Sequence, residues 1–304
     1  MLTSFLLSVI VASTPLLLAA TGELVAEKAG VLNLGLEGMM LVGAVVGFAV
    51  TVVTGNTLLG VVAGMLGGIA VSLVFAVLTL TFLANQVATG LAIAIFGTGL
   101  SALMGAGYVG VAVERLAQLD LPGLGDIPVI GPVVFGQDLL VYVSVGAVAA
   151  VWWFLYRSHG GLVLRAVGDS HDAAHAIGYP VVAIRYAATL FGGAMAGLGG
   201  AYMSLAYNAS WSENMTAGRG WIALALVVFA TWRPHWLLVG AYLFGSIMYL
   251  SLYLQGLGVA VPSQFVSALP YVVTIVVLVA ISRDRTRIRL NAPACLGRPF
   301  HAAG

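Results

Sequence analysis

The sequence has very little charge. Of its 304 residues only 8% are Asp, Glu, Lys or Arg, whereas soluble globular domains carry about 25%. Hydrophobic residues make up 61% of the chain and the mean hydropathy is +1.06. Several apolar runs exceed about 18 residues, and they do not alternate apolar and polar side chains as barrel strands do. We therefore expect an all-α polytopic membrane protein.

Other absences exclude classes of chemistry. Cys295 is the only cysteine, so no disulfide can form within the chain. The sequence has no G-x-x-x-x-G-K-[ST] loop, which argues against a nucleotide site. No Ser-His-Asp or Cys-His arrangement can be assembled from its histidines, so we do not expect an enzyme. The net charge of +1 gives no indication of nucleic-acid binding.

The apolar runs predict about nine transmembrane helices, with a range of eight to ten, some of them discontinuous. We expect one transmembrane domain over residues 1–282 and a basic, mobile tail over 283–304. The spacings Gly43-x-x-x-Gly47 and Gly193-x-x-x-Gly197 favour close helix packing. The expected spans are 2–20, 39–53, 58–80, 87–106, 139–156, 184–207, 221–232, 235–254 and 265–281.

Arginine is concentrated on one side of these spans. Alternation of the spans places the loop of about 157–185, the next loop on that side and the tail on one face, which the positive-inside rule makes cytoplasmic. With nine spans, the N-terminus is then outside. The arginines are Arg157, Arg165, Arg185, Arg233, Arg283, Arg285, Arg287 and Arg289.

A polar stretch separates the first two spans. If the helix is broken here, its free backbone and the side chains of Asn33 and Glu37 would face a solute pathway, because broken helices are tolerated where they line a cavity. The alternative is an ordinary loop whose carboxylates lie in water. For Glu23, Glu27 and Lys28 we expect the solvated loop.

The run 221–232 is too short to cross about 30 Å of hydrocarbon at about 1.5 Å per residue. Gly218 and Gly220 precede it, which suits a half-helix whose N-terminal amides meet a polar solute. A tilted span that extends back through Gly218 is the alternative. Asn85 and Gln86 are further pathway candidates, or else form a helix cap in a tight turn.

The loop between the fifth and sixth expected spans contains signals for a short helix. Asp169 and Ser170 are good N-caps, and Asp172 places a carboxylate in the first turn, where the helix dipole favours it. Gly178 then stops the helix. We therefore expect a capped, mostly polar helix outside the bilayer.

Two histidines of this short helix, His171 and His175, lie four residues apart on one face. No third ligand accompanies them. We therefore expect exposed interface histidines and no metal site.

Several motifs resemble those of one family. The segment Asp172-Ala173-Ala174-x-x-x-Gly178 is similar to the E-A-A-x-x-x-G coupling loop of ABC importer permeases, with Asp in place of Glu. The rest of the pattern resembles the branched-chain amino acid and simple-sugar permease superfamily, and is closest to permeases of nucleoside-type importers. The matching segments, in the family's order, are 27–40, 164–168, 192–200, 218–225 and 232–234.

This resemblance implies an import permease in a bacterial or archaeal plasma membrane, surrounded by lipid. ATP and Mg would be bound by a separate cytoplasmic ATPase, and no cofactor by this chain. A second permease subunit, either a copy or a related chain, and an extracytoplasmic substrate-binding protein would complete the complex. The residues implied in ATPase coupling are Arg165, Asp169, Ser170, Asp172, Ala173, Ala174 and Gly178.

The resemblance also bears on substrate and docking. It implies nucleosides as the solute, followed by simple sugars and branched-chain amino acids. Trp211, Glu213 and Arg219 would face the binding protein, although a solvated loop with an interfacial Trp is the alternative. A secondary transporter is the alternative of a different class. It would need no coupling helix and usually has an intramembrane ion site.

Overall fold

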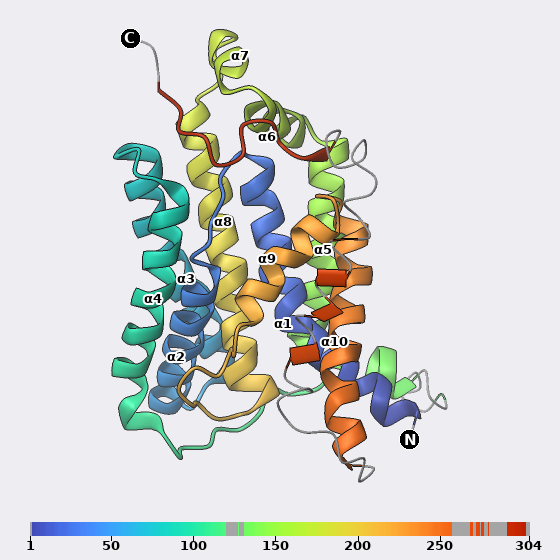
Figure 1. Cartoon of the computed structure of the whole chain (residues 1–304). Helices are drawn as coiled ribbons and strands as arrows, with labels where there is room; N and C mark the ends of the chain where they lie inside the picture. The colour runs from blue at the N-terminus through green and yellow to red at the C-terminus, as the bar shows by residue number, and fades with distance from the viewer. Residues whose placement is uncertain are drawn as a thin grey trace.

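A computed structural model of the chain describes residues 2–119, 131–256 and 291–301, together with isolated residues between 127 and 279. These residues form an all-helical bundle, and two isolated bridges are the only β-type pairing among them. The helices are α1 Leu2–Lys28, α2 Leu36–Thr54, α3 Thr57–Ala76, α4 Gln86–Gly105, α5 Leu139–Arg157, α6 His159–Asp169, α7 His171–Ala176, α8 Val181–Tyr202, α9 Arg219–Phe229 and α10 Pro234–Gly256 (Figure 1).

Most of the expected spans are present. Within the described part of the chain, six helices are long and apolar enough to cross a membrane, namely α1, α2, α3, α4, α5 and α8. Helix α9 has only 11 residues, as expected, and α10 has 23. The first span is longer than predicted, since α1 continues past Ala20 to Lys28. The expected ninth span, 265–281, lies largely outside the described residues.

Capping residues set several helix ends. The side-chain oxygen of Asn56 accepts hydrogen bonds from the amides of Leu58 and Leu59, at 2.9 and 3.2 Å, at the start of α3. Asp138 caps α5 in the same way. These side chains satisfy amides that a helix leaves without an intrahelical partner.

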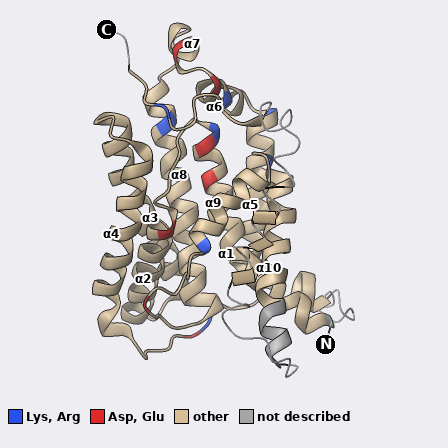
Figure 2. Cartoon of the chain, viewed as in Figure 1, with Lys and Arg blue, Asp and Glu red and all other residues tan. Residues whose placement is uncertain are grey.

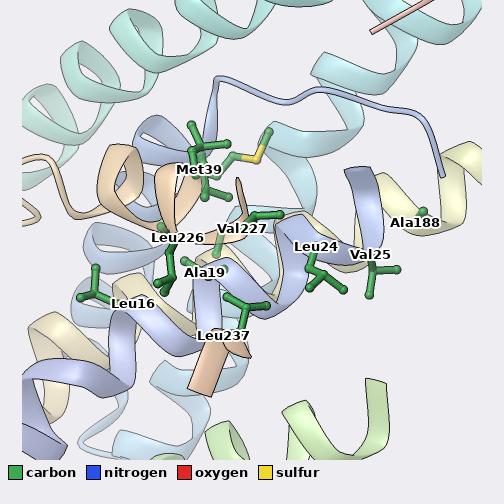
Figure 3. Packing of buried hydrophobic residues seen from close by; sticks show 14 of the residues in the cluster. Leu16, Ala19, Leu24, Val25, Met39, Ala188, Leu226, Val227 and Leu237 are labelled. Atoms are coloured by element: carbon green, nitrogen blue, oxygen red, sulfur yellow. The ribbon is translucent and has the colours of Figure 1, made fainter. Parts of the chain in front are cut away.

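Helix α8 lies at the centre, packed against α1, α2 and α3. Glycines permit this close contact, because a methyl group on Gly43 would lie 2.5 Å from the Cα atom of Gly197 on α8. The predicted role of both glycine spacings in helix packing is confirmed at this contact. A buried apolar cluster joins α1 and α2 to α8, α9 and α10 (Figure 3).

The two ends of the bundle differ in composition. At one end, here called the α7 end, lie the C-terminus of α1, helices α6 and α7, and residues 291–301 (Figure 1). At the other, here called the loop end, the segments around Ala112 and Ser210 pair. Figure 2 shows charged residues gathered mainly at the α7 end. The arginines expected on one face that the structure describes also lie there, since Arg157 and Arg165 belong to the end of α5 and to α6, and Arg185 and Arg233 contact residues 291–301.

Candidate functional site

Helix α1 ends in a Schellman motif, and the chain is then non-helical until α2. Gly30 has a φ of +85°, its amide donates to the carbonyl of Glu27 at 2.8 Å, and the amide of Val31 donates to Ala26 at 3.0 Å. Asn33 holds the non-helical segment. Its side-chain oxygen accepts from the amide of Gly35 at 3.0 Å. The predicted discontinuity is therefore present, and the predicted pathway role of Asn33 stays a prediction.

The expectation of a solvated loop at Glu23, Glu27 and Lys28 is wrong. All three side chains are buried, because α1 extends through them into the bundle. Each carboxylate has a donor from another part of the chain. The amide of Asn33 donates to Glu23 at 3.1 Å, and the indole N–H of Trp232 donates to Glu27 at 2.5 Å. These bonds compensate part of the desolvation of the carboxylates.

Glu37 connects the N-terminus of α2, which follows the break after α1, to the N-terminus of the short helix α9. It lies in the first turn of α2, and its side chain is buried. One carboxylate oxygen accepts from the hydroxyl of Thr216 at 2.5 Å and from the amide of Gly218 at 2.9 Å; the other accepts from the amide of Gly220 at 2.6 Å. The N-termini of α2 and α9 thus both face one negative charge, which their dipoles favour.

This contact changes the interpretation of α9. The short helix was expected to offer its N-terminal amides to a solute, but the amides of Gly218 and Gly220 are bonded to Glu37. Gly220 also permits the close approach, since a methyl group there would lie 2.6 Å from the backbone of Glu37. The junction of Glu37 with Thr216, Gly218 and Gly220, here called the Glu37 junction, is therefore closed by the chain itself.

Asn85 and Gln86 begin α4. The side-chain oxygen of Asn85 accepts from the amide of Ala88 at 3.0 Å, so this residue is the helix cap that we considered as the alternative. Gln86 is buried, and its side-chain oxygen accepts from the amide of Leu32 at 2.8 Å. Gln86 therefore connects α4 to the break between α1 and α2.

The expected docking residues at the loop end differ in exposure. Trp211 is buried, with its ring against Gly105 of α4, and Glu213 is exposed. Arg219 is also buried. It donates to the carbonyl of Thr216 at 3.2 Å and lies 5.3 Å from the centre of the Tyr207 ring. Trp211 and Arg219 thus support the loop from inside the chain, which differs from the surface position we expected.

The short helix of the central loop is present as α7. Ser170 is its N-cap, with the side-chain oxygen accepting from the amide of Ala173 at 3.3 Å. Asp172 lies exposed in the first turn, and Gly178, with a φ of +90°, follows the helix. Asp169 is the last residue of α6 and not a cap, because the chain forms a separate helix, α6, before Ser170.

Two other predicted coupling residues face inward. Ala174 is buried in a cluster with Val167 and Phe300, so only its neighbour Ala173 is exposed to a partner. Arg165 is half-buried, and its guanidinium lies 5.1 Å from the centre of the Tyr156 ring. The exposed surface of α7 consists of Asp172, Ala173 and residues 175–178.

His171 is buried, and the prediction of two exposed histidines is wrong for it. The Phe300 ring packs edge-on against both His171 and His175, with ring centres 5.7 and 5.4 Å apart. Burial, with the positive charge of Arg185, lowers the pKa of His171 to about 4. His171 is therefore neutral near pH 7. Among the described residues, no three His, Cys, Asp or Glu side chains form a metal-binding group.

Arg185, Thr216 and Trp232 were not among the predicted site residues. Arg185 had one usable signal, since a single arginine inside an expected span marks a buried charge that needs acceptors. Trp232 lies in a segment with family resemblance, but its partner Glu27 is 205 residues away along the chain. Thr216 had no signal that distinguishes it from a loop threonine.

Comparison with known proteins identifies the family. A family model described as branched-chain amino acid transport system / permease component matches residues 5–281. The chain is 43% identical to the provisionally named glucose ABC transporter permease protein TsgC13 of Haloferax volcanii, over 95% of each chain. It is 32% identical to the guanosine ABC transporter permease protein NupQ of Bacillus subtilis, over 97% of each.

A third relative is the nucleoside ABC transporter permease protein NupC of Lactococcus lactis. It is 30% identical, over 89% of this chain and 90% of its own. No solved structure matches the chain. The family model and the three relatives are all described or named as permeases, which agrees with the membrane-spanning helices. The chain belongs to the branched-chain amino acid transport system / permease component family of ABC transporter permeases.

Proposed function

We propose that this chain is a transmembrane subunit of an ATP-driven importer for nucleosides, and that α7 is its contact with a cytoplasmic ATPase. A second permease subunit and an extracytoplasmic substrate-binding protein complete the complex. ATP and Mg are bound by the ATPase, and the solute crosses by alternating access. The plasma membrane of a bacterium or archaeon is the proposed location, with the α7 end inside the cell.

The observation that supports the coupling role is the form of α7. A capped helix of six residues lies at one end of the bundle with Asp172 and Ala173 exposed (Figure 1). Its inner face, in contrast, is fixed by Ala174 and His171 against Phe300. A helix that is packed against the bundle on one face and exposed on the other is suited to transmit a displacement by a bound partner to the membrane-spanning helices.

The positive-inside rule supports the same orientation. Arg157 ends α5, Arg165 lies on α6 and Arg233 precedes α10, so all three lie at the α7 end. The charge bias of short loops favours the cytoplasmic side for that end. An ATPase that uses cellular ATP must bind there.

The contacts of Glu37 favour an uncharged solute over an ionic one. The carboxylate of Glu37 is already bonded to the α9 N-terminus, so it offers no open charge for an ionic substrate. Two relatives are named as guanosine and nucleoside permeases, which favours a nucleoside. The 43% identity to a protein named for glucose makes a hexose the second candidate.

Uptake by cells that express the whole complex tests the proposal. We expect labelled guanosine to accumulate, unlabelled nucleosides to compete, and glucose to compete poorly. Deleting residues 170–178, or introducing Gly178→Arg, should abolish uptake while the protein still inserts. Guanosine uptake that survives the deletion would contradict the coupling role. Accumulation of glucose with no effect of nucleosides would select the second candidate.

A further inference from the structure

The C-terminal segment 291–301, here called the C-terminal strap, is bonded across the α7 end. The amide of Cys295 donates to the carbonyl of Gly168 on α6 at 2.9 Å, and the amide of Gly297 donates to the carbonyl of Gly30 at 3.2 Å. The Lys28 ammonium donates to the carbonyl of Asn291 at 2.6 Å. This part of the tail is docked, which differs from the mobile tail that we expected; residues 283–290 lie outside the described part.

Arg185 of α8 fixes the strap from inside. It is among the largest fully buried side chains, with 2% of its surface exposed. One guanidinium nitrogen donates to two backbone carbonyls, that of Gly30 at 2.8 Å and that of Arg298 at 3.1 Å. Because a buried charge is costly without such acceptors, the docked strap contributes to the stability of this position by supplying one of the two carbonyls that Arg185 contacts. The C-terminal dipole of α1 also favours a cation beside Gly30.

The strap contacts α7 at its other end. Phe300 is buried with Val167 of α6, Ala174 of α7 and Val181 of α8. Its ring also packs against His171 and His175. A displacement of α7 therefore pushes directly on the strap, since close-packed side chains transmit strain.

The strap leads from α7 to the break between α1 and α2. Gly30, which accepts from both the strap and Arg185, begins this break. The break is bonded to Gln86 of α4 through Leu32, and it continues into α2, where the Glu37 junction meets α9. Thus one continuous set of contacts runs from the exposed helix α7 to the break between α1 and α2, and from there to the short helix α9.

We propose that the C-terminal strap is a mechanical linker that transmits the displacement of α7 to the break between α1 and α2, with Arg185 as its positioning residue. The proposal rests on the proposed function, because it assumes that a partner displaces α7. The strap moves as one body with α6 and α7 and does not detach during the cycle.

The first test deletes the strap in the whole complex. The purified complex with residues 291–304 removed is reconstituted in vesicles, and guanosine imported is divided by ATP hydrolysed. We expect this coupling ratio to fall at least 10-fold while ATP hydrolysis persists. A poorly folded variant would lower both quantities together, so the ratio separates a linker from a structural element. An unchanged ratio would overturn the proposal.

Point variants keep the test decisive if the deletion prevents assembly. Arg185→Met removes both carbonyl contacts, and we expect it to reduce the ratio at least 5-fold. Arg185→Lys retains a donor and a charge, and should recover at least half of the ratio. Phe300→Ala removes the packing of the strap on α7, together with its packing on Val167 and Val181, and leaves the backbone bonds of the strap in place; it should also reduce the ratio. Equal ratios for Arg185→Met, Phe300→Ala and the unaltered chain would overturn the proposal.

A reversible cross-link distinguishes a linker from a latch that must open. The Sγ atom of Cys295 lies 3.5 Å from the carbonyl oxygen of Asp169, and Cys295 is the only cysteine of the chain. In the Asp169→Cys variant, oxidation should form a disulfide between the introduced cysteine and Cys295, which links the strap to α6. We expect the same coupling ratio before oxidation, after it and after reduction. Loss of transport on oxidation, restored by a reductant, would show that the strap detaches and would contradict the linker.

The two proposals fail in different ways. If the unaltered complex shows no ATP-driven guanosine uptake, the proposed function fails and no ratio can be compared. If the unaltered complex transports guanosine and the strap deletion does so with the same ratio, only the linker fails.

Discussion

The Glu37 junction and α7 differ in where their carboxylates lie, buried at the junction and exposed on α7. At the junction, a buried carboxylate accepts three hydrogen bonds from Thr216, Gly218 and Gly220, and no solvent contact is needed. At α7, the carboxylate of Asp172 is exposed, and the helix is fixed only on its inner face. The junction is thus completed within the chain, whereas α7 has an open polar surface. Because of this difference, the Glu37 junction supports the bundle from inside, whereas α7 is the region proposed to contact a partner.

Glu37→Ala should have the largest effect on stability. It leaves the buried amide of Gly220, the half-buried amide of Gly218 and the buried hydroxyl of Thr216 without their acceptor, and each lost buried partner costs about 1–3 kcal/mol. We expect a loss on the order of 3 kcal/mol, measured as thermal unfolding in detergent. Glu213→Ala, which removes an exposed carboxylate from the neighbouring loop, is the control and should change stability by less than about 0.5 kcal/mol. Equal midpoints for the two variants would contradict the importance of the junction.

Gly220→Ala tests the close approach at the same junction. The added methyl would lie 2.6 Å from the backbone of Glu37, so the helices must separate. Overpacking of this kind costs about 1–3 kcal/mol. Gly146→Ala on α5 is the matched control, since open space surrounds that position. There the better helix propensity of alanine should raise stability by about 0.5–1 kcal/mol, which gives the opposite sign.

Local features of both regions could be predicted from the sequence, but their long-range contacts could not. Ser170, Asp172 and Gly178 have local capping and stop preferences, so α7 could be expected. The bond between Glu37 and Gly220 joins residues 183 positions apart, and no local pattern marks it. A single sequence gives no information on such pairs.

The errors have a common physical cause. Glu23 and Glu27 were assigned to water because an isolated carboxylate is costly to bury, yet each has a specific donor. For Glu23 it is the amide of Asn33 in the break that follows α1, and for Glu27 it is the indole of Trp232, 205 residues away. The tail was expected to be mobile because it is polar and contains proline. Its docking depends on backbone bonds to Gly30 and Gly168, which composition does not reveal.

A fall in pH should weaken the packing of His171 on the inner face of α7. The pKa of His171 is about 4 in the folded chain, below its ordinary value of 6.5. Between these values the unfolded state binds more protons, so stability is retained above about pH 6.5 and falls as the pH is lowered toward 4. The charged groups that act on this ring are Arg185, Asp172 and Arg298.

The variant His171→Asn isolates this histidine from other acid-titrating groups. We expect the midpoint of thermal unfolding to fall less steeply from pH 6.5 to 4 in the variant than in the unaltered chain. The measurement is a melting series in detergent at fixed ionic strength. Parallel slopes would mean that the pKa of His171 is the same in the folded and unfolded chain, which would contradict its burial against Phe300.

Asp172→Lys should have the smallest effect on stability and a large effect on transport. The side chain is exposed, and loss of its interaction with the helix dipole costs about 0.3–1 kcal/mol. Guanosine uptake by the complex should nevertheless fall at least 10-fold. Glu114→Lys, which reverses an exposed carboxylate at the loop end, serves as the matched control. Normal uptake by the Asp172 variant would contradict the proposal that α7, unlike the Glu37 junction, contacts a partner.

Cross-linking from α7 tests the central claim most directly. The exposed residue Ala173 is changed to Cys in a Cys295→Ser background, and a photoactivatable thiol reagent is attached in the reconstituted complex. We expect illumination to join this chain to the ATPase subunit, with a yield that changes when ATP is added. A cross-link to the substrate-binding protein, or none to the ATPase in a complex that still transports, would contradict the role of α7.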